Sequence, residues 1–313
     1  MHRRNLSFLI AAVTVLAYLT SCTKTPVDNT VRTVSFLMDP CHIWEENGSD
    51  AITKTSIVDG STAFRWAQGD TVGIYPDAGA QIYFTLNVEG DGKSAQFDGG
   101  GWEFKSGSTY YSYYPFVGDI YLKRNRIPVS YLGQKQVGTT NFSHVGPFDY
   151  MYTEGVSAVS GGLNFQYHRL GCFIRLRCVL PGGTYTKLAI TAPEQLFTAK
   201  GYFDLTSSSP AIVATEYTNQ LTIDLASVTT TGTSAEFVVY LLSAPVDLSG
   251  KEITISVLND QKKEYQCKKT PSAAYVANDL RKLGCTSFTE VPQSMGLIVE
   301  DWGNGGSIGG NAD

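Results

Sequence analysis

Side chains that commonly take part in catalysis are few in this sequence and far apart. After the leader the histidines are His42, His144 and His168. His168 alternates with apolar residues, where a histidine in a structural hydrogen bond is more common than a general base. His42 precedes Glu45 and Glu46, but one imidazole and two carboxylates in a loop are weak evidence for a metal site. Without a phosphate loop or nucleophile elbow, we predict no enzyme, metal or cofactor; only a dispersed carboxylate pair of the glycosidase type stays open.

The five cysteines that follow Cys22 fit buried positions better than a disulfide framework. They are Cys41, Cys172, Cys178, Cys267 and Cys285. An odd number cannot close entirely in pairs. Cys172 and Cys178 fall in one predicted strand, about 20 Å apart, and so cannot bridge each other. We therefore predict apolar, buried thiols.

The residue whose chemistry is best supported is Cys22. A basic start at His2–Arg4 and an apolar run from Leu6 to Leu19 form a leader too short to span a membrane comfortably. The sequence Leu19-Thr20-Ser21-Cys22 resembles a bacterial lipobox, which implies cleavage before Cys22 and acylation of its thiol and amine. A secretory leader followed by a chance cysteine is the alternative. Acyl chains would anchor the protein in lipid, and Thr23, in place of Asp, favours the outer membrane.

Charge and composition exclude several function classes. Loss of Arg3 and Arg4 with the leader leaves 22 basic against 29 acidic residues, a net charge of −7. This acidic balance disfavours nucleic acid as a partner. Hydrophobic residues make up 42% and charged residues 17% of the chain, so a large core is expected and general disorder is not.

Alternating apolar residues between frequent turns predict an all-β protein. The pattern is clearest in residues 82–88 and recurs in 163–167, 221–225 and 253–257. Turn pairs such as Gly69-Asp70 follow every ten or so residues, a spacing typical of β-sandwiches. Residues 237–242 are apolar on both faces, which suits a central strand. One helical turn is expected near Pro193–Lys200.

The length and a break in the pattern at residues 154–162 predict two domains. The expected parts are a lipoprotein signal peptide at 1–21, a lipidated tether at 22–30, an N-terminal β-sandwich at 31–158, and a C-terminal β-sandwich with a Gly-rich tail at 159–313.

Several landmarks, in order, resemble the fimbrillin family of type V pilus lipoproteins. They are Phe64–Tyr75 with its Trp66 and Gly69-Asp70, Tyr113-Tyr114-Pro115, Ile127-Pro128 with Gln134 or Gln136, Asp149-Tyr150-Met151, Phe165–His168, and Gly201–Leu205. The resemblance covers most of the chain after Cys22. It implies two tandem transthyretin-like antiparallel β-sandwiches, in which Trp66 fills the end of a core.

The same resemblance implies a structural or adhesive subunit of a fimbrium, as stalk, tip or anchor, joined to other subunits by strand exchange. The candidate departing strand is Arg32–Met38, with Val34, Phe36 and Met38 on one face; the alternative is an ordinary first strand. Relatives are cut after an arginine, but residues 39–63 contain none, so Lys54 is the candidate processing site. The missing arginine favours a tip or anchor role.

The C-terminal stretch from Met295 to Trp302 is a second candidate for exchange. Leu297 and Val299 fit a donor strand, an intradomain strand or a disordered end equally well. The expected partners are other fimbrial subunits, outer-membrane lipid through acylated Cys22, and surface glycans or proteins. The alternative function is a surface lipoprotein that binds glycans without polymerising, suggested by tyrosines such as Tyr110 and Tyr111, although alternation explains most of these as core residues.

Overall fold

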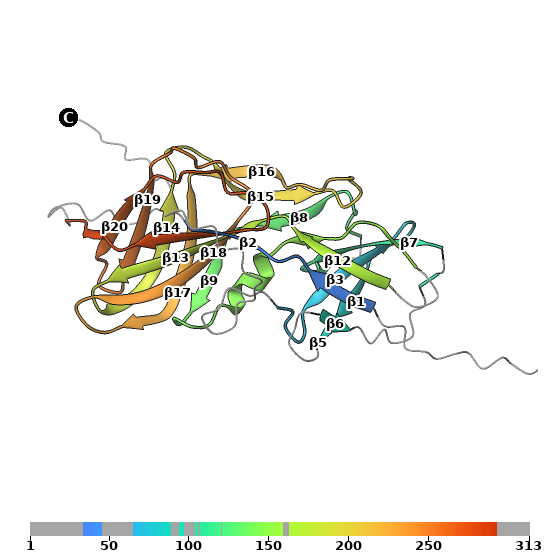
Figure 1. Cartoon of the computed structure of the whole chain (residues 1–313), viewed down its shortest axis with the longest axis horizontal. Helices are drawn as coiled ribbons and strands as arrows, with labels where there is room; N and C mark the ends of the chain where they lie inside the picture. The colour runs from blue at the N-terminus through green and yellow to red at the C-terminus, as the bar shows by residue number, and fades with distance from the viewer. Residues whose placement is uncertain are drawn as a thin grey trace, which may run out of the picture. The chain divides into compact units, whose positions relative to one another are not determined.

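The fold is that of a computed structural model, which describes residues 34–45, 65–88, 94–96, 104–105, 107–119, 121–158 and 163–292. Within these ranges the elements are β-strands apart from one 3-10 helix, η1 (Ser143–Phe148), which confirms the predicted all-β class (Figure 1). The same ranges contain no helix long and apolar enough to cross a membrane.

The largest sheet has nine strands and a small aromatic core. Its members are β1 (Val34–Met38), β3 (Thr71–Pro76), β4 (Ile82–Thr85), β5 (Asn87–Val88), β6 (Ser94–Gln96), β7 (Thr109–Tyr114), β10 (Met151–Tyr152), β11 (Val156–Ser157) and β12 (Leu163–Arg169). They pair in the order β4-β3-β7-β10-β12-β1-β6-β5, with β11 also on β7. Phe36, Trp66 and Tyr167 are among the buried residues of this core, which we call the small core.

Two further sheets share the large core, to which Val239 of one and Ile255 of the other contribute. The four-stranded sheet has the order β18-β13-β21-β2. It comprises β2 (His42–Glu45), β13 (Cys172–Leu180), β18 (Ala235–Ser243) and β21 (Asp279–Cys285). The six-stranded sheet has the order β22-β20-β19-β14-β17-β9. It comprises β9 (Gln134–Val137), β14 (Gly183–Thr191), β17 (Gln220–Thr230), β19 (Ile253–Asn259), β20 (Glu264–Lys269) and β22 (Thr289–Glu290).

A three-stranded sheet completes the described strands. Its order is β16-β15-β8, and its members are β8 (Ile127–Ser130), β15 (Phe197–Phe203) and β16 (Val213–Thr218). The single helical turn expected near Pro193–Lys200 is wrong, because Phe197–Phe203 forms β15 and buries Phe197 and Phe203 in the large core.

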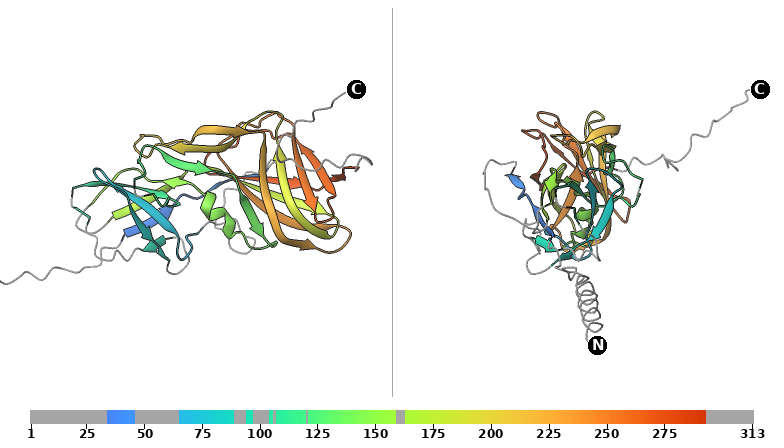
Figure 2. Two further views of the ribbon diagram at one scale, coloured as in Figure 1. Left: turned by 180° about the vertical axis from the view of Figure 1, so that it is seen from behind. Right: turned by 90° about the vertical axis from the view of Figure 1, so that its right-hand side faces the viewer.

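The fimbrillin resemblance implied purely antiparallel sheets, and this expectation is wrong. Strand β1 runs parallel to β12, β2 and β13 each run parallel to β21, and β9 runs parallel to β17. The blue β1 lies beside the yellow-green β12 in both Figure 1 and the reversed view of Figure 2. Parallel neighbours need a long connection, and here the connections cross much of the chain.

The alternating patterns have the expected burial. In β12, Leu163, Phe165 and Tyr167 are buried while Asn164 and Gln166 are exposed. The strands β17 and β19 likewise alternate buried apolar residues with exposed or half-buried ones. Strand β18 is apolar on both faces as predicted, but it stands at an edge of its sheet and not at the centre.

The domain boundary between residues 158 and 159 stays a prediction. Strand β12 follows that boundary, yet its apolar residues belong to the small core. Strands β8 and β9 precede it, yet they pair with β15 and β17. Chain segments from both sides of the boundary therefore contribute to the same sheets.

We expect Gly73→Ala to destabilise the protein by about 1–3 kcal/mol, the usual cost of overpacking. A methyl group on Gly73 would overlap the ring of Tyr113, which is fully buried and donates a hydrogen bond from Oη to Gln81 at 2.6 Å. Urea denaturation measures the change. The matched control is Gly284→Ala in β21, where the added Cβ meets no atom within 4 Å; equal losses in both variants would contradict this account.

Candidate functional site

The N-terminal segment supplies one strand to each of two sheets. Strand β1 lies between β12, in parallel register from Val34↔Leu163 to Met38↔Tyr167, and β6. Strand β2 follows after a short connection and pairs with β21 at the edge of the four-stranded sheet. We call residues 34–45 the bridging segment. It is the part of the chain on which the site is centred.

Phe36 anchors β1 in the small core. Its side chain is fully buried, stacks on Phe165 at 5.8 Å and meets the edge of Trp66 at 6.4 Å between ring centroids. Burial of such a ring contributes roughly 1.5–3 kcal/mol. The Trp66 indole Nε1 also donates a hydrogen bond to the Phe36 carbonyl at 3.0 Å. Trp66 is 3% exposed, which confirms its predicted place in a core.

The turn after Trp66 has the predicted chemistry. Gly69 adopts a φ of 91°, in the region that favours glycine. The Ala67 amide donates to Asp70 Oδ2 at 2.8 Å, and the Tyr114 hydroxyl donates to Asp70 Oδ1 at 3.0 Å. Burial raises the pKa of the Asp70 carboxyl, while its two hydrogen bonds oppose the shift. The turn thus positions Trp66 against β1.

Strand β2 is held on β21 by Trp44 and by its own backbone. The Arg281 guanidinium lies 4.6 Å from the centre of the Trp44 ring and 5.2 Å from that of Tyr275, within the range of cation–π attraction. Arg281 Nε also donates to Asp279 Oδ2 at 2.9 Å. Trp44 remains 43% exposed, so one face of this contact is open to solvent.

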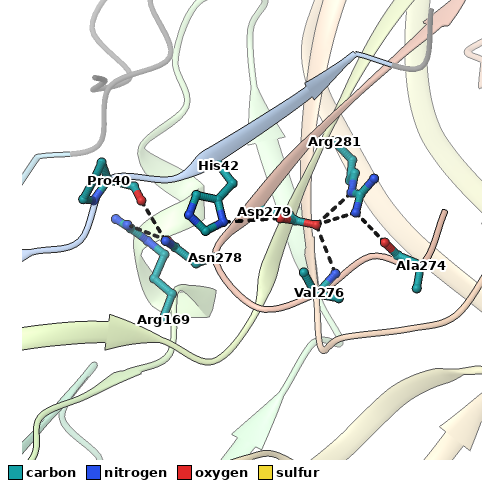
Figure 3. Close-up of polar contacts among 8 residues, drawn as sticks. All are labelled: Pro40, His42, Arg169, Ala274, Val276, Asn278, Asp279 and Arg281. Carbon is teal, nitrogen blue, oxygen red and sulfur yellow. Dashed lines mark hydrogen bonds and ion pairs between the residues drawn. The ribbon is translucent and has the colours of Figure 1, made fainter. Parts of the chain in front are cut away.

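Between β1 and β2, the connection Asp39–Cys41 lies on a polar network. Figure 3 shows the part of it at Pro40 and Asn278. Arg169 Nη1 donates to the Asp39 carbonyl at 2.6 Å, and Asn278 Nδ2 donates to the Pro40 carbonyl at 2.7 Å. The His42 amide donates to the Asn278 carbonyl at 2.9 Å. Groups of β12 and of Asn278, both far from this connection in the sequence, therefore hold it.

The Asp39 carboxylate adds contacts specific to its side chain. Its Oδ2 lies 2.5 Å from His168 Nδ1, and its Oδ1 accepts a hydrogen bond from Gln166 Nε2 at 2.6 Å. His168 therefore occupies a satisfied structural position, as the sequence favoured. The described residues contain no cluster of three or more side chains suited to a metal ion.

The network includes a buried ion pair. Arg169 Nε lies 3.0 Å from Asp149 Oδ2, and both side chains are almost completely buried. Burial raises the pKa of the Asp149 carboxyl above its ordinary value, although the Arg169 charge opposes this. The Asp149 charge in turn raises the pKa of Arg169 against the effect of burial, which lowers it. Each charge depends on the other.

Asp279 is completely buried beside β2, and its Oδ1 accepts no hydrogen bond. The Arg281 guanidinium binds the other carboxylate oxygen, Oδ2, and His42 Nδ1 lies 4.0 Å from Oδ1 (Figure 3). Asn278, which precedes Asp279, has a φ of 67°, a conformation that asparagine tolerates better than most residues. This backbone turn directs the Asn278 side chain to Pro40.

The five cysteines that follow Cys22 are buried and form no disulfide bond. Burial raises the pKa of Cys41 and of Cys172 to about 12, so these thiols stay protonated at neutral pH. Cys172 and Cys178 share strand β13, as predicted. Tyr110, Tyr113 and Tyr114 are also buried, which confirms their expected place in the core.

The predicted exchange residues are described only in part. Phe36 is buried and Met38 is half-buried, whereas Val34 belongs to β1 but its side chain is not described. Cys22, Lys54, Leu297 and Val299 lie outside the described residues. The sequence interpretation missed β2, although alternation of the buried Cys41 and Ile43 with the exposed His42 and Trp44 was a usable signal.

Comparison with known proteins supports the fold. No protein-family model and no curated protein matches the chain. A candidate cell adhesion protein from Bacteroides ovatus aligns over 87% of this chain and 99% of its own, with 14% identity and a TM-score of 0.52. A second, from Bacteroides uniformis, aligns over 85% and 96%, with 13% identity and a TM-score of 0.48.

The tip fimbrial protein Mfa3 from Porphyromonas gingivalis aligns over 72% of this chain and 95% of its own, with 8% identity and a TM-score of 0.36. At these identities the likeness concerns the fold, and the Bacteroides ovatus structure carries it. The chain therefore shares the fold of a candidate adhesion protein, which agrees with the fimbrillin resemblance.

We expect Arg169→Met to cost about 3–5 kcal/mol at neutral pH, because it leaves the buried Asp149 charge unpaired. An unpaired, buried carboxyl has a folded-state pKa above its unfolded value, so the loss should shrink as the pH falls and Asp149 takes up a proton. Urea denaturation at pH 5 and at pH 7.5 measures this loss in the free energy of unfolding.

The control is Arg177→Met, which breaks an exposed pair with Glu236 and should cost less than about 1 kcal/mol. Adding Asp149→Asn to Arg169→Met should recover part of the loss. A loss independent of pH that Asp149→Asn does not relieve would contradict the paired-charge account.

Proposed function

We propose that this chain is a surface lipoprotein and a structural or adhesive subunit of a fimbrium, as stalk, tip or anchor. The observation that carries the proposal is the bridging segment, which completes two sheets with one stretch of chain. The fold shared with a candidate cell adhesion protein supports the same function. Other subunits, joined by strand exchange, are the proposed partners.

The bridging segment has the properties of a strand that can be exchanged. Departure of β1 would leave the facing edges of β12 and β6 without a partner and would empty the position of Phe36 in the small core. Departure of β2 would uncover the edge of β21. Unpaired N–H and C=O groups beside an apolar groove are best satisfied by another extended segment.

The order of the chain makes Lys54 a suitable processing site. Strand β2 ends at Glu45 and the next described residue is Arg65. A cut after Lys54 would therefore separate both β1 and β2 from the rest of the molecule. The chain segment with Leu297 and Val299 is the proposed donor that replaces them in a neighbouring subunit.

Limited treatment of the purified protein with a trypsin-like protease tests the exchange. We expect ladders that resist detergent and a new N-terminus at Thr55, because the freed groove would take a strand from the next molecule. Lys54→Gln should prevent both the cut and the ladders. A version that lacks residues 297–313 should be cut but should not form ladders. A nicked monomer that keeps its bridging segment would contradict strand exchange.

The lipid anchor is tested separately at Cys22. Replacement by alanine removes the thiol to be acylated, so Cys22→Ala should move the protein from the membrane fraction to the soluble fraction. Cys41→Ala is the matched control, because Cys41 is buried in the large core, and that variant should stay with the membrane. Membrane association unchanged in Cys22→Ala would contradict the anchor without affecting the strand-exchange proposal.

A further inference from the structure

Three of the five buried thiols come together in the large core. Cys178 of β13 and Cys285 of β21 are partners in the parallel register of these strands, and Phe237 of β18 stands opposite Cys178 on the other side. All three side chains are buried. Paired residues of neighbouring strands lie about 4.8 Å apart and face the same side of the sheet. Phe237, Cys178 and Cys285 therefore form one inward-facing row across the four-stranded sheet.

The facing sheet brings Cys267 to the end of this row. Phe237 stacks on Tyr185 of β14 at 5.1 Å between ring centroids, and Tyr185 in turn meets the edge of Tyr265 of β20 at 6.4 Å. The strand order β18-β13-β21 thus runs alongside the order β14-β19-β20, which places Cys285 opposite β20. Cys267 follows Tyr265 by two residues, so it points to the same side of β20.

The thiols of this group act on one another. Burial raises the pKa of the Cys285 thiol, and Cys267 raises it further through its charge and through a side-chain hydrogen bond to Cys285. Burial also raises the pKa of Cys178, to which the charges of Cys285 and Cys267 add. The hydrogen bond shows that the side chains of Cys267 and Cys285 are in contact across the two sheets. We call Cys178, Cys267 and Cys285 the thiol cluster.

Solvent reaches one thiol of the cluster more easily than the other two. Cys267 is 4% exposed, whereas Cys178 and Cys285 are 0% exposed. Strand β20 is bordered on its outer side by β22, which has only two residues, so few backbone bonds must open to uncover Cys267. The raised pKa values keep Cys178 and Cys285 protonated at neutral pH, and a protonated thiol is a poor nucleophile. An oxidant from solvent therefore reacts first at Cys267.

We propose that Cys267 and Cys285 form a disulfide that joins the two sheets of the large core, with Cys178 left as a thiol. The oxidant is a small-molecule or protein disulfide. The Cys267 thiolate attacks one of its sulfurs and displaces a thiol, and the Cys285 thiolate then attacks Cys267 Sγ and displaces the second thiol. Two S–H bonds become one S–S bond, and the two protons and two electrons pass to the oxidant, which becomes two thiols. The bond fixes β21, the partner of β2, to the opposite sheet, and it does not require strand exchange.

Oxidised glutathione tests the pair in the full chain purified in detergent. After incubation, denaturation and alkylation of the remaining thiols, intact mass should show that two of the five thiols that follow Cys22 are protected, and dithiothreitol should restore all five. Trypsin places the three cysteines of the cluster in separate peptides, and we expect residues 264–268 linked to residues 283–313. The oxidised form should also melt at a temperature about 5 °C higher, because the disulfide closes a loop in the unfolded chain.

Two substitutions separate this pair from the other pairs of the cluster. Cys178→Ala is the matched control, because it removes the thiol outside the proposed bond, and this variant should still protect two thiols. Cys267→Ala should protect none. If Cys267→Ala does not fold, Cys267→Ser replaces it, and the peptide map of the unchanged protein decides without either variant. A link between residues 178–187 and 283–313, or five thiols that all stay reactive, overturns the proposal.

Discussion

The structure depends on how strand edges satisfy their N–H and C=O groups. Nearly every described element is a strand, and an unpaired backbone group inside the molecule costs about 1–3 kcal/mol. The four-stranded sheet meets this constraint differently at its two ends. At β18 the edge is bonded by side chains that belong permanently to the same fold. At β2 the sheet is completed by a short strand that enters from the N-terminal segment.

The two edges of the four-stranded sheet therefore differ in how easily they could be opened. Strand β2 has four residues and an exposed Trp44, whereas β18 has nine residues and lies beneath β9 and η1. Replacement of β2 would break one parallel ladder and one cation–π contact. Opening β18 would uncover several buried polar groups at once. The proposed assembly through strand edges requires that only selected edges be open, and the contacts of Gln134 and Gln136 with β18 fit that requirement.

The sequence predicted the parts of the fold that follow from local periodicity. Alternation identified β12, β17 and β19, and the Gly69-Asp70 turn has the expected conformation. The sequence prediction was wrong where a partner distant in the sequence decides the position of a strand in its sheet. Strand β18 looked central because its apolar faces are indistinguishable from those of a central strand until the glutamine contacts are known.

The same limit applies to the site. Phe36 and Met38 were identified from their spacing, but Arg169 and Asn278 were not, because their roles arise from contacts across more than 100 residues of chain. Strand β2 was missed although its residues alternate, because a pattern of four residues is short and its partner β21 lies far away in the sequence. Strand β15 was missed because Pro193 resembles a helix start when its surroundings are unknown.

The contacts to the bridging segment fall into two kinds, which differ in what they ask of an exchanged strand. Trp66, Arg169 and Asn278 bond to the carbonyls of Phe36, Asp39 and Pro40. Any extended chain offers carbonyls at this spacing, so these bonds can re-form with a different sequence.

The contacts made by the Phe36 ring and the Asp39 carboxylate depend instead on the side chains. A donor strand that keeps a large apolar residue and, three positions later, an acid would recover both kinds. If strands are exchanged as proposed, the backbone bonds would accept extended segments in general, while the small core and the side chains of His168 and Gln166 would favour particular sequences. Under the proposed strand exchange, such a division would let one groove hold its own strand first and a partner's strand afterwards.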